Sequence, residues 1–256
     1  MEKKKSLPLK QRRLEINIDN IMNFGIIAAG EGSRLRTEGV EFPKPLVPLD
    51  GEPMIGRLLN IFIRLGAESV AVIVNEEMKE VQEYVEDLVT RFPVPFDLIV
   101  KSTPSSMHSF YEISECFSGK GRFILTTVDT IFREEDFARY AGFFSQSPEE
   151  VDGVMAVTPY IDDEKPLYVE VDDEMRITGF LDKPTPSSRF ISGGIYGLGQ
   201  KSIEVLRNCI DKGVSRMRNF QRELISSGLD LRAYPIDKII DVDHASDIAK
   251  AEAFIK

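Results

Sequence analysis

Cysteine and histidine are scarce in this chain of 256 residues, which has two of each. Cys116 and Cys209 are far apart in the sequence, so we expect reduced thiols in a cytoplasmic protein. Two histidines cannot supply a zinc cluster. Long apolar runs are also missing, because the sequence contains no stretch of 18 apolar residues and no recognisable signal peptide. The sequence therefore predicts neither a disulfide framework nor a membrane span.

Positive charge is in deficit as well. Lys and Arg number 32 against 42 Asp and Glu, which gives a formal net charge of -10. This balance argues against general binding to nucleic acid or to an anionic membrane. An anionic small-molecule substrate would need a local cluster of basic residues or metal ions. The hydrophobic content of 42% is enough for a large core, and α/β domains of this size are commonly single units.

Residues 1–21 differ from the rest of the chain, because they are basic and contain few large apolar side chains. They could form an ordered arm that packs on the domain or on a second subunit, or a mobile extension. We expect a poorly ordered or loosely docked arm, since the segment lacks the apolar content to order itself. The domain is predicted to span residues 22–256.

Strands and helices alternate along this domain. Apolar runs predict strands over residues 70–74, 96–100 and 122–127, and amphipathic patterns predict the helices between them. This order is typical of an α/β fold with a Rossmann-like, mostly parallel mixed sheet flanked by helices. Ligands of such sheets bind at the carboxyl ends of the strands, so the residues just after each strand are candidates for function.

A glycine loop follows the first predicted strand. Small residues at the strand's exit leave room for a base or a phosphate to approach the main chain, and the glycines permit a turn whose amides can point at an anion. The candidate nucleotide-binding residues of this loop are Ala28, Ala29, Gly30, Gly32 and Ser33. Leu35 stands where a dinucleotide-binding fold would have its third glycine, and the Walker pattern is absent. A purely structural glycine turn is the alternative.

Two cations accompany the loop. The planar fork of Arg34 suits phosphate oxygens, and Lys44, between two prolines, offers a point charge on a stiff segment. The loop and the two cations together predict a polyphosphate site.

The segments 30–35 (GEGSRL) and 42–46 (FPKPL) resemble the N-terminal signature of the sugar-1-phosphate nucleotidyltransferases. The resemblance covers about residues 23–255. It implies a GT-A-like nucleotidyltransferase fold, an NTP and a sugar 1-phosphate as substrates, and Mg²⁺ as the cofactor. A nucleoside monophosphate would pass to the sugar 1-phosphate and pyrophosphate would leave, with Arg34 and Lys44 set against the pyrophosphate. Catalysis would then be placement and charge neutralisation.

The same resemblance implies two metal ligands. Asp129 follows a predicted strand and resembles the family's glycine-aspartate motif that binds magnesium, although Val128 replaces the glycine. The alternative is an aspartate that caps a turn. Residues 238–252 resemble the family's closing motif, in which Asp241 aligns best with the second ligand. Asp243 would point the same way in an extended segment, so the choice between the two carboxylates stays open.

The sequence predicts a hairpin over residues 168–180. By resemblance, the segments that follow the hairpin would bind the acceptor, the sugar 1-phosphate. By resemblance, Lys183 would bind the sugar phosphate and take part in catalysis, and Asp182 would bind a sugar hydroxyl. Gly194 would let the sugar approach the main chain. Asp182 is shorter than the family's usual glutamate, and a surface Asp-Lys turn is the alternative.

The loop 101–109 should read the base. Ser106 and His108 could hydrogen-bond to a base, but the serines could equally cap the following helix. Uracil, cytosine, guanine, thymine and adenine all stay open, as do the sugar and the oligomeric state.

Three classes of function remain possible on the sequence. The first is the sugar-1-phosphate nucleotidyltransferase, acting on neither nucleic acid nor membranes. The second is a cytidylyltransferase that acts on phosphocholine or another non-sugar phosphate, which aromatic residues caging a quaternary amine would favour. The third is a non-catalytic nucleotide- or sugar-binding module, which the loss of Arg34, Lys44 or Asp129 would favour; all three are present.

Overall fold

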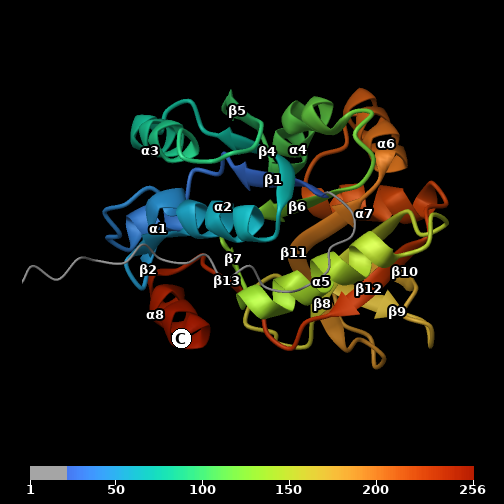
Figure 1. The fold of residues 1–256 in the computed structure, drawn as a ribbon. Coiled ribbons are helices and arrows are strands. Elements are labelled where there is room, and N and C mark those ends of the chain that lie inside the picture. Colours follow the sequence, from blue (N-terminus) through green and yellow to red (C-terminus); the bar gives the residue numbers. More distant parts are fainter. Residues whose placement is uncertain (1–21) are drawn as a thin grey trace, which may run out of the picture.

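A nine-stranded mixed sheet forms the middle of the structure, with helices over both of its faces (Figure 1). The computed structural model describes residues 22–256, so the arm predicted for residues 1–21 lies outside the described residues. The strand order is β10-β9-β11-β6-β1-β4-β5, and β8 and β12 extend the sheet from β11. The predicted α/β fold, with a mixed sheet flanked by helices, is confirmed.

The half of the sheet next to the glycine loop is parallel. It consists of β1 (Met22–Ala28), β4 (Ala67–Val74), β5 (Phe96–Val100) and β6 (Phe123–Thr127). β1 lies between β4 and β6, and all of its residues are buried. Ala28 pairs with Val74 and Ile27 with Thr127, so the carboxyl ends of these strands come together. The predicted strands are confirmed, with β4 beginning earlier, at Ala67.

The other half is mainly antiparallel. It consists of β8 (Gly153–Thr158), β9 (Tyr168–Val171), β10 (Ile177–Leu181), β11 (Phe190–Leu198) and β12 (Leu231–Pro235). β11 joins the halves, because it runs antiparallel to β6, β8 and β9. β9 and β10 form the predicted hairpin, and β12 runs parallel to β8. The register of β11 shifts between Ser192 and Tyr196, where Gly194 has a φ of 72°.

Eight α-helices occur among the described residues. They are α1 (Ser33–Thr37), α2 (Met54–Arg64), α3 (Lys79–Val89), α4 (Ser106–Ser114), α5 (Glu134–Gln146), α6 (Gln200–Asp211), α7 (Met217–Ser226) and α8 (Ala245–Ile255). Short 3₁₀ turns, Lys44–Leu46 and Glu115–Phe117, add to them.

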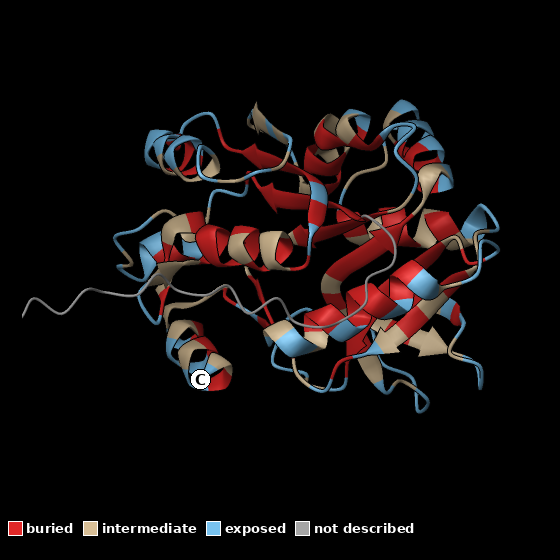
Figure 2. Ribbon diagram, in the orientation of Figure 1, coloured by how far each residue is buried: buried red, intermediate tan, exposed pale blue. Residues whose placement is uncertain are grey.

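Two apolar layers pack on the sheet, and the alternation of side chains along β1 contributes to both. Phe24, Ile26 and Ala28 belong to the layer under α2, α3, α5 and α8, whereas Ile27 belongs to the layer under α4, α6 and α7. Phe24 stacks on Phe62 of α2 with 4.4 Å between the ring centroids. Figure 2 shows the central strands buried between the helices. Burial on both faces explains why these strands are continuous apolar runs in the sequence.

Two short ribbons lie outside the main sheet. β2 (Pro48–Leu49) pairs with β3 (Glu52–Pro53), and β7 (Thr130–Ile131) pairs with β13 (Ile240–Asp241). The second ribbon joins the segment after β6 to the segment before α8. It therefore places Asp129 and Asp241 side by side, although they are far apart in the sequence.

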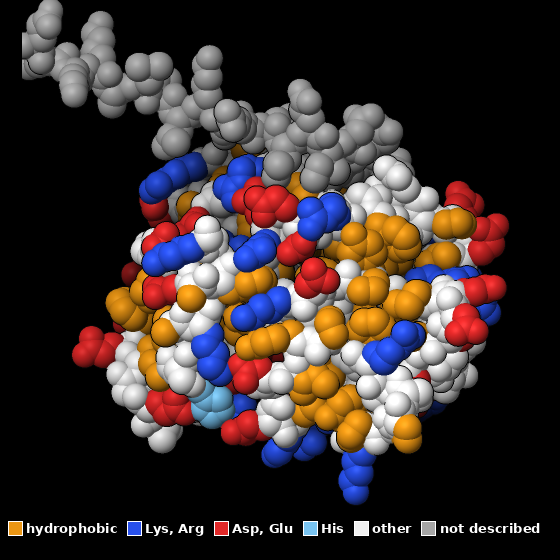
Figure 3. All heavy atoms as spheres, turned by 90° about the horizontal axis from the view of Figure 1, so that it is seen from below, with side chains coloured by type: hydrophobic (Ala, Val, Ile, Leu, Met, Phe, Trp, Pro, Cys, Tyr) orange, Lys and Arg blue, Asp and Glu red, His pale blue; other side chains and the backbone are white. Residues whose placement is uncertain are grey.

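The surface carries charges of both signs. On the face that Figure 3 shows, Lys and Arg side chains are interspersed with Asp and Glu and do not form one continuous basic patch. Among residues 22–256, no helix combines the length and the apolar character needed to cross a bilayer.

Candidate active site

The glycine loop has the close packing that its sequence predicts. Gly32 has a φ of 61° and caps α1, and a Cβ added there would lie 2.6 Å from the Cβ of Lys44. Glycine is therefore needed both for the backbone conformation and for contact with the lysine stem. Gly30 is exposed, and a Cβ added to it would meet nothing within 4 Å, so a ligand can approach the main chain there.

A cavity of about 420 Å³ lies between this loop and the start of α4. We call it the glycine-loop cavity. The predicted nucleotide-binding residues that line it are Ala29, Gly30, Gly32, Ser33 and Ser106. Ala28 does not line it, because its side chain is buried under α2 in the apolar layer. His108 does not line it either, and its Nδ1 lies 2.9 Å from the Oγ of Ser105.

Asn75 also lines the glycine-loop cavity and was missed by the sequence analysis. It directly follows β4 and is buried. Its Nδ2 donates a hydrogen bond to the Ala29 carbonyl, and its Oδ1 accepts hydrogen bonds from the Ser102 hydroxyl and the Glu77 backbone N–H. Asn75 therefore ties three walls of the cavity together. Its place just after a buried strand was the signal that could have found it.

The three candidate carboxylates line a second cavity, of about 340 Å³, which extends to the start of α7. We call it the α7 cavity. Thr130 pairs with Asp241 across the β7–β13 ribbon, and the backbone N–H of Val242 donates to the Asp129 carbonyl. Val242 is fully buried, so Asp241 and Asp243 both face the cavity, as expected for an extended segment. Residues shared by the two cavities are Ser106, Thr127 and Asp129.

Lys44 and Arg34 reach these carboxylates. The Nζ of Lys44 lies 2.5 Å from Asp129 and 2.6 Å from Asp243, and Arg34 lies 2.9 Å from Asp243. The Lys44 side chain is only 10% exposed, so its ion pairs are poorly screened. Burial opposes its charged form, but attraction to Asp129 and Asp243 raises the pKa of Lys44 above its ordinary value. Burial likewise opposes the ionised form of Asp129, yet the charge of Lys44 lowers the pKa of that carboxyl.

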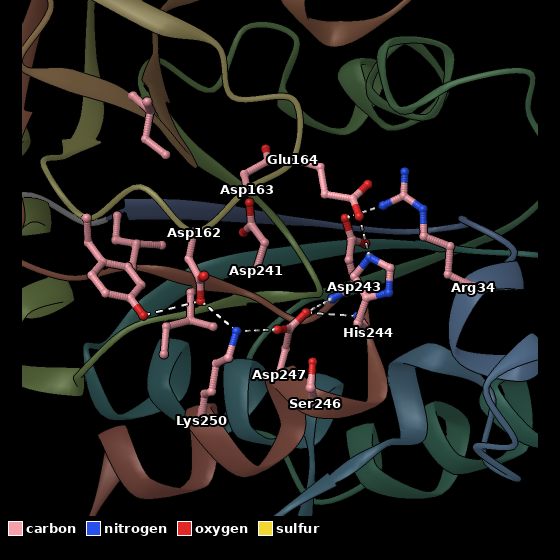
Figure 4. A pocket seen from close by; sticks show the side chains of 14 residues that line it. Arg34, Asp162, Asp163, Glu164, Asp241, Asp243, His244, Ser246, Asp247 and Lys250 are labelled. Atoms are coloured by element: carbon pink, nitrogen blue, oxygen red, sulfur yellow. Dashed lines mark hydrogen bonds and ion pairs between the residues drawn. The ribbon is translucent and has the colours of Figure 1, made fainter.

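Asp241 has a different environment from its neighbours. It makes no ion pair with any cation among residues 22–256, and its one hydrogen bond comes from the Thr130 hydroxyl at 3.4 Å. Asp241 is exposed toward the cavity, yet partial loss of hydration beside the surrounding protein and repulsion from Asp129 and Asp243 both raise the pKa of Asp241 above its ordinary value. Figure 4 shows Asp241 and Asp243, with Asp163 beside Asp241 and Arg34 reaching toward Asp243.

This donor set fits a hard divalent cation. Mg²⁺ takes oxygen ligands and is usually held by one or two carboxylates, with water and phosphate oxygens completing its shell. Asp129 and Asp241 could supply those carboxylates, and a cation between them would relieve the repulsion that acts on Asp241. Within residues 22–256, no three His, Cys, Asp or Glu side chains come together as a complete metal site. Substrate oxygens would have to supply further ligands.

The predicted acceptor residues are placed differently from one another. Gly194 lines the α7 cavity, and a Cβ there would lie 2.4 Å from the Thr130 hydroxyl, so packing against β7 requires glycine. Asp182 binds Arg218 and Arg222 of α7, at 2.7 and 2.8 Å. Lys183 is exposed and, like Asp182, does not line the α7 cavity.

Three cations that the sequence did not indicate line the α7 cavity: Lys165, Arg216 and Arg218. Lys165 lies in the loop between β8 and β9, and the two arginines lie at the start of α7. An Arg-x-Arg pair at the start of an amphipathic helix was the only local signal, and it is common on protein surfaces.

Comparison with known proteins agrees with this geometry. The sequence model of the family described as "Nucleotidyl transferase" matches residues 25–255. The chain belongs to this family. One curated relative is the bifunctional protein GlmU of Methanococcus maripaludis, 23% identical over 91% of this chain and 54% of that protein. Another is the UTP–glucose-1-phosphate uridylyltransferase AglF of Haloferax volcanii, 24% identical over 90% of this chain and 95% of that protein.

The fold of this family member also matches solved structures. The inositol-1-phosphate CTP transferase from T. maritima superimposes with a TM-score of 0.75 at 18% identity, over 92% of this chain and 96% of that one. The chain spans about half the length of the GlmU proteins that it matches. These likenesses establish the family and the fold.

Proposed function

We propose that this protein transfers a nucleoside monophosphate from an NTP to a sugar 1-phosphate and releases pyrophosphate, with Mg²⁺ as its cofactor. The observation that carries the proposal is the meeting of two cavities at Asp129. One cavity is walled by the glycine loop and Lys44, and the other by the carboxylates and the cations of α7. Two anionic substrates could therefore meet at a single carboxylate flanked by basic side chains.

In the proposed reaction, an oxygen of the acceptor phosphate attacks the α-phosphorus of the NTP. The bond from the α-phosphorus to the bridging oxygen breaks, and pyrophosphate leaves in line. Both partners are already ionised near neutral pH, so no general base is required. Placement and charge neutralisation would provide the catalysis.

Each of the chain's own residues would have a separate part in this reaction. Arg34 and Lys44 would bind the departing pyrophosphate oxygens, exchanging their present carboxylate partners for phosphate. Asp129 and Asp241 would hold Mg²⁺, which when bound supplies positive charge to the α-phosphate. Ser106 would bind at the junction of the two substrates, since it lines both cavities.

The lining of the α7 cavity supports a polyhydroxyl acceptor over phosphocholine. Tyr196 is the only aromatic residue among its described lining, and a quaternary amine is normally held by several aromatic faces. Ser192 and Gln221 instead offer hydrogen-bonding groups. Two similar proteins, a glucose-1-phosphate uridylyltransferase and an inositol-1-phosphate CTP transferase, are named for acceptors of the same kind.

A substrate panel tests the proposal. The protein is incubated with Mg²⁺ and each of the five common triphosphates, against sugar 1-phosphates, inositol 1-phosphate and phosphocholine, and pyrophosphate release is measured. We expect release that requires one triphosphate together with one sugar 1-phosphate. Release with phosphocholine alone among the acceptors would favour the cytidylyltransferase alternative. Absence of release with every pair would favour a binding module.

A further inference from the structure

The closing segment, residues 240–247, carries Asp241 and Asp243 and runs into α8. Little of it is fixed by regular structure. Its strand pairs with β7 over two residues, and one further backbone hydrogen bond joins the Val242 N–H to the Asp129 carbonyl at 3.1 Å. The position of its carboxylates relative to the glycine loop therefore depends on side-chain contacts as well.

Arg34 and Lys44 supply some of these contacts through their ion pairs with Asp243. In the proposed reaction both cations turn to the oxygens of the departing pyrophosphate. The ion pairs with Asp243 would then be lost while the carboxylates of the closing segment must still hold Mg²⁺. A contact that keeps the segment in place during the reaction has to come from another residue.

Glu38 makes such a contact. It directly follows α1, and its backbone N–H donates to the Arg34 carbonyl at 3.0 Å. Its carboxylate reaches the start of α8, where Oε1 accepts a hydrogen bond from Nδ1 of His244 at 2.5 Å and Oε2 accepts one from the backbone N–H of Ala245 at 2.7 Å. Within residues 22–256, Arg34 is the only other residue of the glycine loop and α1 whose side chain binds the closing segment.

The chemistry of this contact suits a fixed position. The first N–H groups of a helix have no partner within the helix, and a negative charge at that end complements the helix dipole. The hydrogen bonds from His244 and Ala245 lower the pKa of Glu38 below its ordinary value, so its carboxylate is ionised near neutral pH. Asp247 accepts the backbone N–H of His244 at 2.9 Å from within α8. His244 is thereby held from two helices, next to Asp243 (Figure 4).

We propose that Glu38 is a positioning residue of the active site: through His244 and Ala245 it holds the carboxylates of the closing segment in place while substrate phosphates occupy the cations of the glycine-loop side. The inference rests on the proposed function, because it names the residue that keeps the metal ligands of that reaction in position. Glu38 lines neither cavity, so it acts only through the segment that it binds.

Three variants and a control separate positioning from a general structural role. E38A removes the carboxylate, H244A removes one of its two donors, and E38Q keeps an oxygen that can accept the Ala245 N–H. The control is E41A, because Glu41 is also exposed, carries the same charge and lines neither cavity. In the pyrophosphate assay, E38A should raise the half-saturating Mg²⁺ concentration about 10-fold and leave kcat at saturating Mg²⁺ within about threefold. H244A and E38Q should show smaller rises, and E41A should match the wild type.

Amide hydrogen exchange, followed by NMR, gives a readout that does not depend on activity. The Val242 N–H is bonded to the Asp129 carbonyl and not to Glu38, so its exchange reports whether the closing segment stays in place. Val242 should exchange about 10-fold faster in E38A than in the wild type, and at the wild-type rate in E41A. The melting temperature of E38A should stay within about 4 °C of the wild type. If E38A does not fold, H244A carries the same comparison.

Faster exchange of Val242 together with a higher Mg²⁺ requirement would support the inference. Wild-type exchange or an unchanged Mg²⁺ requirement in E38A would overturn it while leaving the proposed function intact. An equal loss of kcat at every Mg²⁺ concentration would overturn it too, because it would show a general structural role. If the wild type releases no pyrophosphate with any pair, the proposed function fails, and the exchange of Val242 alone decides whether Glu38 holds the segment.

Discussion

The two cavities differ in how their cations are held. On the glycine-loop side, Lys44 lines the cavity, is nearly buried and is bound by two carboxylates. Arg34 follows the loop but does not line this cavity, and it is bound by one of those carboxylates. On the α7 side, Arg216 and Lys165 are exposed, and Arg216 sits on a strained backbone. Because of this difference, we expect the two cavities to control different kinetic constants. The paired charges of the first half would set turnover, and the uncommitted cations of the second would set affinity for the acceptor.

The largest effects should come from the cations of the glycine-loop side. K44A should lower kcat about 10²- to 10³-fold, because developing charge on pyrophosphate loses a donor and the two carboxylates lose their shared cation. R34A should lose most turnover for the first of these reasons. Pyrophosphate release under saturating substrates measures both. The matched control is K79A, a lysine of α3 near the same loop, which should keep its turnover. Near-normal turnover of K44A would show that the cations beside the glycine loop do not set turnover.

A smaller effect should separate the two carboxylates of the closing segment. D241N should weaken the response to Mg²⁺ about 100-fold, because Asp241 is the carboxylate without a cation partner. D243N should weaken it at most about 10-fold, since Asp243 already binds Arg34 and Lys44. Titration of activity with Mg²⁺ measures both variants. If D243N has the larger effect, the assignment of the ligands is reversed.

The smallest effect should come from Asp182 on the acceptor side. D182N frees Arg218 and Arg222 from an exposed carboxylate and should raise the acceptor KM only about 2- to 5-fold. Hydrogen bonds from Arg222 and Arg218 lower the pKa of Asp182. A carboxylate whose folded pKa is depressed keeps its stabilising effect above its unfolded pKa and loses it only as the pH falls through the folded pKa. The ratio of the acceptor KM of D182N to that of the wild type should therefore stay constant between about pH 6 and 9. A ratio that changes across this range would show that another group controls the site.

The sequence predicted best those site residues that stand next to a recognisable strand or turn. The glycine loop, Lys44 and Asp129 each follow a strand or turn whose pattern is visible in the sequence, and the structure brings them together. The ribbon of β7 and β13 was not foreseen, because two-residue strands leave no periodic pattern and the two strands are far apart in the sequence. The site roles of these residues stay predictions until activity is measured.

The acceptor side was less predictable for a physical reason. Its lining comes from the loop before β9, from the bulge in β11 and from the start of α7, which meet only through long-range antiparallel pairing. Neither the strain at Arg216 nor its lack of a partner can be read from residue order. Lys183 shows the converse, because its motif resembles the family while its side chain lies outside the α7 cavity.

Replacing Asp129 is the sharpest test of a site shared by two anionic substrates, because Asp129 lines both cavities and binds Lys44. The measurement is Mg²⁺-dependent pyrophosphate release by D129N beside the wild type, with melting temperatures to show that both are folded. We expect release by the wild type only when NTP, acceptor and Mg²⁺ are present together, and none above background for folded D129N. Release by D129N at the wild-type rate, with its Mg²⁺ dependence unchanged, would contradict it.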